Sequence, residues 1–146
     1  MRVSTAVVLP AARERAWDVL LRWEEQPRWM RDADSVRVVS PGRSGVGVRI
    51  AVRTRVLGVP LFTEILEVVA WEPPGRLVMA HRGFVRGTGE WRLEPFEGGT
   101  RFMWTEELSI PVPLLGEMAL LAYQPFLRRL MRDGLAGLQS LLAEAT

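Results

Sequence analysis

The chain of 146 residues has no cysteine, no lysine and no asparagine, and it has a single histidine. Without cysteine it has no disulfide framework, no thiolate metal site and no cysteine nucleophile. One histidine makes a zinc site unexpected, and the absence of lysine excludes a Walker-type phosphate loop. We therefore expect no metal and no cofactor. The lack of cysteine suits the reducing cytoplasm, where we expect the protein to reside.

Long apolar runs are also missing. The N-terminal ten residues carry one arginine and an apolar run too short for a signal-peptide core. The longest apolar run, Leu114 to Ala122, is interrupted by Gly116 and Glu117, and it falls short of the length that crosses a bilayer. We expect no integral membrane association.

Basic residues are present but are not gathered together. All nineteen are arginine, they are scattered among 17 acidic residues, and the formal net charge is only +2. A surface that follows a phosphate backbone needs a concentrated basic patch. We therefore expect no nucleic-acid partner. The length fits one domain over residues 1–146, whose core needs no disulfide or metal.

Hydrophobic periodicity predicts one strand, two short helices, six more strands and a long terminal helix. The predicted ranges are strand 3–9, helices 11–23 and 24–32, strands 36–39, 46–57, 62–71, 76–82, 86–95 and 100–110, and a helix from 113 almost to 146. An antiparallel sheet must cover its apolar face, and only the terminal helix is long enough to do so. The predicted fold class is α+β, with a curved antiparallel sheet of about seven strands around that helix.

The terminal helix shows an apolar stripe that should face the sheet. The stripe comprises Leu115, Met118, Ala122, Phe126, Leu130, Gly134, Leu138 and Leu141. Pro125 should kink this helix, because proline removes a backbone hydrogen bond and clashes with the preceding turn. We expect an opening beside the N-terminal half of the helix, facing Trp29.

Several short motifs, in their order and spacing, resemble one known family. They are Pro10-Ala11 with Trp17, then Trp29, the stretch Glu72 to Leu77, Gly87 to Leu93, and Gly98 to Phe102. Together they resemble the START-like (SRPBCC, birch-pollen-allergen-like) superfamily in its bacterial polyketide cyclase/dehydrase-related branch. The resemblance covers essentially the whole chain. It implies the helix-grip fold and a cavity for a lipid, polyketide or isoprenoid, but no single reaction, because members differ in function.

Strand phases place polar residues on the inner face of the sheet. A hairpin through residues 96–99 would pair Trp91 with Trp104 and Gly89 with Glu106. The preceding hairpin would bring His81 opposite Gly89, and Glu64 could join the row by the same phase. This row could orient a ligand carbonyl or hydroxyl. Alternatively, His81 lies at an exposed strand end and Glu106 pairs with a rim arginine.

Aromatic residues divide between core and cavity. Trp17 and Trp71 are expected in the core or wall, Trp29 is a candidate gate, and the Tyr123 hydroxyl points either into the cavity or to the surface. The predicted ligand-binding residues are Trp29, Val52, Thr54, Glu64, Leu66, Met79, His81, Trp91, Phe102, Trp104, Glu106, Met118, Ala122, Tyr123 and Phe126.

Three functions are compatible with these observations. The first is a non-catalytic binder or carrier of a hydrophobic small molecule. The second is a cyclase/dehydratase-like lyase that uses His81 or Glu106 as general acid or base. The third is a protein-interaction module like the co-chaperone relatives. The oligomeric state, monomer or homodimer, is left open.

Overall fold

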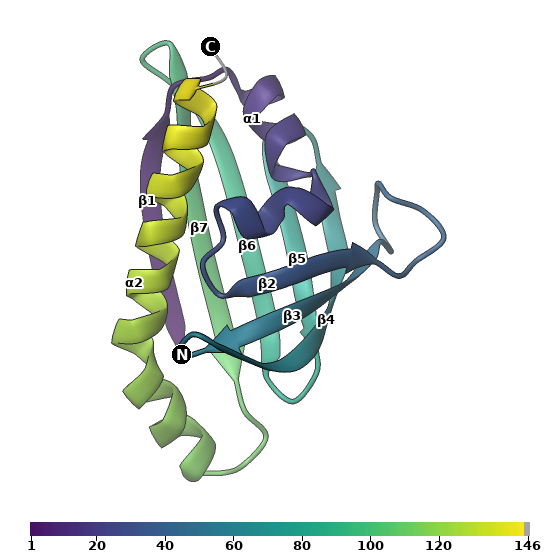
Figure 1. Cartoon of the computed structure of the whole chain (residues 1–146), viewed down its shortest axis with the longest axis vertical. Coiled ribbons are helices and arrows are strands. Elements are labelled where there is room, and N and C mark those ends of the chain that lie inside the picture. Colours follow the sequence, from purple (N-terminus) through teal and green to yellow (C-terminus); the bar gives the residue numbers. More distant parts are fainter. Residues whose placement is uncertain (145–146) are drawn as a thin grey trace.

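A computed structural model describes residues 1–144 and contains seven strands, two α-helices and one 3-10 helix (Figure 1). The elements are β1 (Arg2–Leu9), α1 (Arg13–Leu20), η1 (Trp23–Arg28), β2 (Ala33–Val38), β3 (Arg49–Val56), β4 (Val59–Glu72), β5 (Arg76–Arg82), β6 (Arg86–Phe96), β7 (Gly99–Ser109) and α2 (Leu115–Glu144). The predicted order of elements and the α+β helix-grip fold are confirmed. The predicted extension of the last helix beyond residue 144 lies outside the described residues. No helix in the described part is long and apolar enough to span a membrane.

All seven strands belong to one antiparallel sheet in the order β1-β7-β6-β5-β4-β3-β2. The sheet curls so strongly that β2 and β3 cross in front of β5 to β7 (Figure 1). Tight two-residue turns connect β3 to β4 and β6 to β7. Glu97 and Gly98 both have positive φ in the β6–β7 turn, and so do Leu57 and Gly58 in the β3–β4 turn. Two such residues in succession give the turn twist that suits a hairpin.

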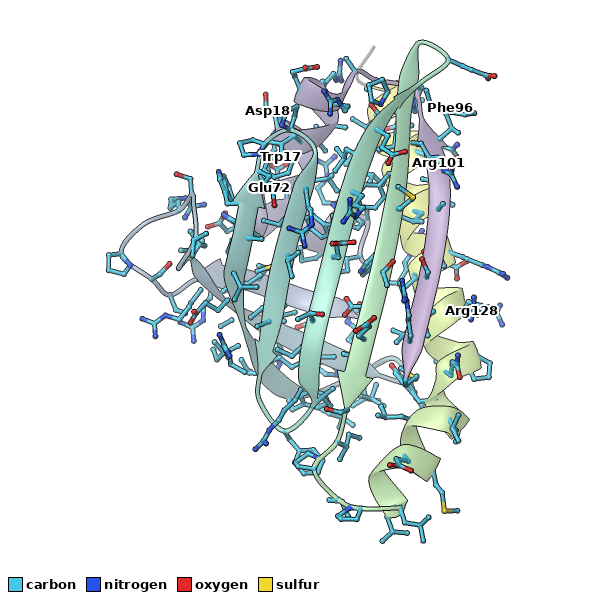
Figure 2. The ribbon with its side chains drawn as sticks, turned by 180° about the vertical axis from the view of Figure 1, so that it is seen from behind. Trp17, Asp18, Glu72, Phe96, Arg101 and Arg128 are labelled. Atoms are coloured by element: carbon cyan, nitrogen blue, oxygen red, sulfur yellow. The ribbon has the colours of Figure 1, made fainter. Side chains whose placement is uncertain are left out.

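Alternation along the strands decides which side chains face the interior. On β3, Ile50, Val52 and Thr54 are buried, whereas Arg49 and Arg53 are exposed. The β6–β7 register pairs Trp91 with Trp104 and Gly89 with Glu106, as the sequence predicts. Figure 2 shows the opposite, outer face of the sheet, where charged side chains such as Arg101 and Glu72 lie in solvent.

Helix α2 lies along β1 and β7, but the predicted apolar stripe is wrong in the first half of the helix. Met118 and Phe126 are 57% and 43% exposed, and Ala122 is also exposed. The buried positions are Gly116, Leu120, Leu127, Met131, Gly134, Leu135, Leu138 and Leu142. The prediction failed because Leu and Met occur on every face of the first turns, so the sequence did not determine which face of the helix is buried. The first turns, green in Figure 1, bend away from the axis of the rest, and Pro125 lies inside the helix.

Trp29 belongs to the core and is not a gate. It is 1% exposed, and its ring lies 5.8 Å from Trp91 and 6.0 Å from Trp104, centroid to centroid. The C-terminal half of α2 approaches it closely, because a Cβ on Gly134 would lie only 3.1 Å from the Trp29 carbonyl oxygen. Glycine at position 134 therefore allows α2 to pack against the segment that follows η1.

Candidate functional site

A cavity of about 350 Å³ lies between the concave face of the sheet and the first half of α2. This is within the range of about 300–1,000 Å³ that is typical of small-molecule pockets. The cavity is lined by Gln26, Met30, Asp32, Ile50, Val52, Thr54, Val56, Phe62, Glu64, Leu66, Leu77, Met79, His81, Val85, Gly89, Trp91, Trp104, Glu106, Leu108, Ile110, Ala119, Leu120, Tyr123 and Leu127. Most of these side chains are apolar, so a hydrophobic molecule would be well accommodated.

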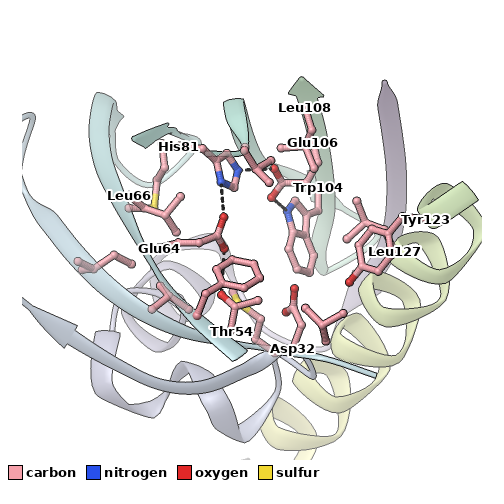
Figure 3. A pocket seen from close by; sticks show the side chains of 18 of the residues that line it. Asp32, Thr54, Glu64, Leu66, His81, Trp104, Glu106, Leu108, Tyr123 and Leu127 are labelled. Atoms are coloured by element: carbon pink, nitrogen blue, oxygen red, sulfur yellow. Dashed lines mark hydrogen bonds and ion pairs between the residues drawn. The ribbon is translucent and has the colours of Figure 1, made fainter. Parts of the chain in front are cut away.

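His81 lies between two carboxylates on the cavity wall (Figure 3). Its Nε2 is 3.0 Å from Glu106 Oε2, a hydrogen bond, and its Nδ1 is 3.5 Å from Glu64 Oε1, an ion-pair contact. The three side chains are only 11%, 13% and 18% exposed, for His81, Glu106 and Glu64. His81 is therefore not at an exposed strand end, and Glu106 pairs with His81 and not with a rim arginine.

Two further donors complete this polar row. Trp104 Nε1 donates to Glu106 Oε1 at 3.0 Å, and Thr54 Oγ1 donates to Glu64 Oε2 at 3.0 Å. The row thus runs from Thr54 on β3 through Glu64, His81 and Glu106 to Trp104 on β7, across five adjacent strands. Each ionised group in it has at least one partner, as buried charges require.

Strand register and one glycine make this arrangement possible. Gly89 on β6 stands directly opposite Glu106, and a Cβ at this position would lie 2.7 Å from Glu106 Oε1. The Glu106 side chain on β7 therefore lies over Gly89 on β6 and reaches His81 on β5, the strand beyond. The predicted pairing of His81 with Gly89 is wrong by two residues. His81 opposes Gly87, because the β5–β6 loop has only three residues, 83–85.

The two carboxylates hold His81 in its charged form. Burial alone lowers the pKa of His81, but the hydrogen bonds and negative charges of Glu106 and Glu64 outweigh it and raise the pKa to about 10. The imidazole is therefore a cation at neutral pH, and protonated imidazole donates from both nitrogens.

Asp32 is a cavity residue that the sequence analysis missed. It precedes β2, and its carbonyl oxygen accepts a hydrogen bond from the Arg55 amide at 2.7 Å. Burial raises the pKa of its carboxyl to about 6, and the charges of Glu106 and Glu64 act in the same direction. Asp32 lies in an irregular segment, where alternation predicts no direction for a side chain. An acidic residue between a short helix and a strand was the only available signal.

Tyr123 and Ala119 line the cavity from α2, and the Tyr123 hydroxyl points towards Asp32 in Figure 3. Burial raises the pKa of Tyr123, and the charges of Asp32 and Glu64 add to the effect. Ala119 and Phe62 are lining residues that are also exposed. The cavity therefore opens beside the first turns of α2 as predicted, but it does not face Trp29.

The structure brings together ten of the predicted ligand-binding residues around the cavity. They are Val52, Thr54, Glu64, Leu66, Met79, His81, Trp91, Trp104, Glu106 and Tyr123. The other five lie elsewhere. Trp29 and Phe102 are fully packed core residues, and Met118, Ala122 and Phe126 face outward from α2.

A metal-binding arrangement is not found in residues 1–144, where no group of three or more histidine, aspartate or glutamate side chains could hold an ion. Both His81 nitrogens face carboxylates instead of the cavity space.

Comparisons with known proteins agree with this architecture. Residues 1–143 match the family described as polyketide cyclase/dehydrase and lipid transport. No curated protein matches the chain. Among solved structures, TTHA0849 from Thermus thermophilus has a TM-score of 0.82 at 20% identity, covering 100% of this chain and 99% of that one.

Two further structures extend the comparison. A START superfamily protein from Mycobacterium smegmatis has a TM-score of 0.73 at 16% identity, with 99% of both chains covered. The Streptomyces aromatase/cyclase Zhui has a TM-score of 0.78 at 13% identity, covering 98% of this chain and 93% of that one. At these identities the structures share the fold, whereas the family match spans nearly the whole sequence. The chain therefore belongs to the polyketide cyclase/dehydrase and lipid transport family.

Proposed function

We propose that the protein binds a hydrophobic small molecule of the lipid, polyketide or isoprenoid class in the cavity between the sheet and α2. The observation that carries this proposal is the apolar cavity of about 350 Å³, which contains a single organised row of polar groups. Apolar walls supply affinity, and a few fixed polar groups supply orientation. A core that only needed to be stable would fill this space with side chains, because protein interiors are close-packed.

Native mass spectrometry of the protein purified from its own host tests the proposal directly. We expect a co-purifying lipophilic molecule that leaves on denaturation. In parallel, the neutral dye Nile red should bind saturably with one site and quench tryptophan fluorescence, because Trp91 and Trp104 line the cavity. Absence of both a co-purifying molecule and saturable dye binding would contradict the proposal.

A second candidate function is cyclase or dehydratase activity, and one observation favours it. Asp32 carries a carboxyl whose pKa of about 6 lies close to neutral pH, which suits a general base. His81 and Glu106 are less suitable for proton transfer, because each is already bound to the other. Here Asp32 would remove a proton from a carbon next to one carbonyl, and that carbon would bond to the carbon of a second carbonyl. The oxygen of the second carbonyl would take up the proton from Asp32, and the resulting hydroxyl would leave as water when the first carbon loses a further proton.

Incubation with a linear poly-β-carbonyl compound tests the enzymatic alternative. Catalysis predicts loss of one water per molecule, detected by mass, at a rate above that in buffer. Asp32→Asn should abolish the difference, whereas Asp18→Asn, an exposed substitution on α1, should preserve it. Equal rates with and without protein would leave binding as the supported function.

A further inference from the structure

The charges that line the cavity are mostly negative. Asp32, Glu64 and Glu106 are carboxylates, and His81 is the one positive group. The chain has nineteen basic residues, all arginine, yet no arginine is among the lining residues in the described part of the chain. A ligand that enters this cavity therefore meets an excess of negative charge, in surroundings where screening by water is weak.

Most hydrogen-bond donors in the cavity face a carboxylate of the protein. His81 donates from Nε2 to Glu106, and its buried Nδ1 makes an ion-pair contact with Glu64 at 3.5 Å without a hydrogen bond. Trp104 donates to Glu106, and Thr54 donates to Glu64. Gln26 uses its amide nitrogen on the Leu20 carbonyl. Among the lining side chains of residues 1–144, this leaves the Tyr123 hydroxyl and the Trp91 indole N–H as neutral donors for a ligand.

Acceptors, in contrast, remain available. The Asp32 carboxylate has no side-chain partner in the part of the chain that the structure describes; its own backbone amide is its one contact. In Figure 3 it points into the cavity from the wall opposite His81. An ionised carboxylate offers about four acceptor sites, and one hydrogen bond from its own amide leaves the others free to accept from a ligand.

We propose that the cavity selects amphiphiles whose polar group donates hydrogen bonds to Asp32, preferring a cationic amine to a neutral hydroxyl and discriminating against a carboxylate such as a fatty acid. This inference rests on the proposed binding function and specifies its ligand class. An amine would pair with Asp32 through charge-assisted hydrogen bonds, which are stronger than neutral ones. A carboxylate would meet three like charges, and the one cation, His81, is already held between Glu106 and Glu64.

A matched series of three amphiphiles tests this proposal. Decylamine, decanol and decanoate share one apolar chain and differ in the polar group. Each is titrated, below its aggregation limit and near neutral pH, into the protein loaded with Nile red, and displacement of the dye is measured. We expect decylamine to bind at least about tenfold more tightly than decanoate, with decanol between them.

Asp32→Asn is the diagnostic variant, and Asp18→Asn is its control. Asp32→Asn should reduce the amine-to-carboxylate affinity ratio about tenfold, and Asp18→Asn should leave it unchanged. Decanoate binding as tightly as decylamine to the unmodified protein would overturn the inference, and so would an unchanged ratio in a folded Asp32→Asn variant. Failure of Nile red to bind, together with the absence of a co-purifying molecule, would instead overturn the proposed function, so the two failures are distinguishable.

Discussion

At the level of single side chains, His81 has the environment that most constrains the cavity. It is a buried cation between Glu64 and Glu106, held by contacts of 3.5 and 3.0 Å. Removing one member of a buried ion pair leaves an uncompensated charge, which typically costs about 3–5 kcal/mol. The three residues therefore act as a unit that keeps one wall of the cavity in a fixed shape.

The protonation state of His81 can be measured directly, because it is the only histidine in the chain. A pKa of about 10 predicts that its ring proton resonances stay constant through neutral pH and shift only near pH 10. Proton NMR titration provides the measurement. Glu106→Gln removes the closer carboxylate and should lower the midpoint. A midpoint at the usual value of about 6.5 in the unmodified protein would contradict this prediction.

Asp32 should destabilise the folded protein when no ligand is bound. Its folded pKa of about 6 is above the ordinary 3.8, so the folded state binds this proton more tightly than the unfolded state does. The free energy of unfolding therefore falls as pH rises from about 4 to about 6, and the loss is complete above this window. Asp32→Asn should stabilise the protein by on the order of 2 kcal/mol at about pH 8, and by little near pH 4.

Urea unfolding at the two pH values provides the measurement, with Asp18→Asn as the control for loss of one exposed acidic charge. A variant that gains stability while losing ligand preference would identify Asp32 as a residue kept for binding. A destabilised Asp32→Asn at about pH 8 would instead indicate that the carboxylate has a structural partner.

The residue-scale predictions from sequence succeeded where alternation applies and failed where it does not. Glu64, His81 and Glu106 lie on regular strands, so their shared face followed from period-two counting. The exact register of β5 on β6 did not follow, because it depends on a loop of three residues. Asp32 lies before β2 in irregular backbone, where no period exists, and so it was missed.

At the level of elements, β6 makes room in the site, because its residue Gly89 has no side chain. Gly89 leaves open the space that the Glu106 carboxylate occupies, and a Cβ there would lie 3.1 Å from Glu106 Cδ as well as 2.7 Å from Oε1. Contacts under 3.0 Å with a Cβ force something to move. The carboxylate is the group that would move, since the paired backbones of β6 and β7 are fixed by their ladder.

Gly89→Ala should therefore displace Glu106 from His81 without breaking the sheet. We expect the unfolding free energy to fall by about 1–2 kcal/mol, and the His81 titration midpoint to decrease in the same NMR experiment. Gly83→Ala is the control, because nothing lies within 4 Å of a Cβ at that position and its φ is not positive. An unchanged His81 midpoint in Gly89→Ala would show that Glu106 tolerates the added methyl group.

Helix α2 shows where element-scale prediction from sequence reaches its limit. Its C-terminal half followed the predicted stripe at Gly134 and Leu138, because polar residues there mark the outer face. In the first half, Leu115, Met118 and Leu121 are exposed, although they are apolar. Apolar residues on both faces remove the contrast from which a phase is inferred.

At the scale of the whole molecule, the fold followed from sequence because several independent signals agreed. Seven strand-like segments, one long amphipathic helix and the family motifs all pointed to the same arrangement. The cavity volume could not be predicted from the sequence, because it depends on how completely the packed side chains fill the interior. Only coordinates distinguish a cavity of about 350 Å³ from a filled interior with the same topology.

Two substitutions on α2 test whether a ligand enters the cavity beside the first half of this helix. Ala119 and Ala122 are both exposed on the first half of α2, but only Ala119 lines the cavity. Ala119→Trp places a large ring at the opening, so we expect Nile red affinity to fall about tenfold. Ala122→Trp adds the same ring to the same helix on the outward face, and affinity should be unchanged.

Surface positions of this kind usually alter unfolding free energies by about 0.5 kcal/mol or less, so urea unfolding should show both variants equally folded. Equal dye affinities in the two variants would mean that the ligand enters elsewhere, past the β3–β4 turn or the β5–β6 loop, and that α2 forms a wall of the cavity without controlling its entrance.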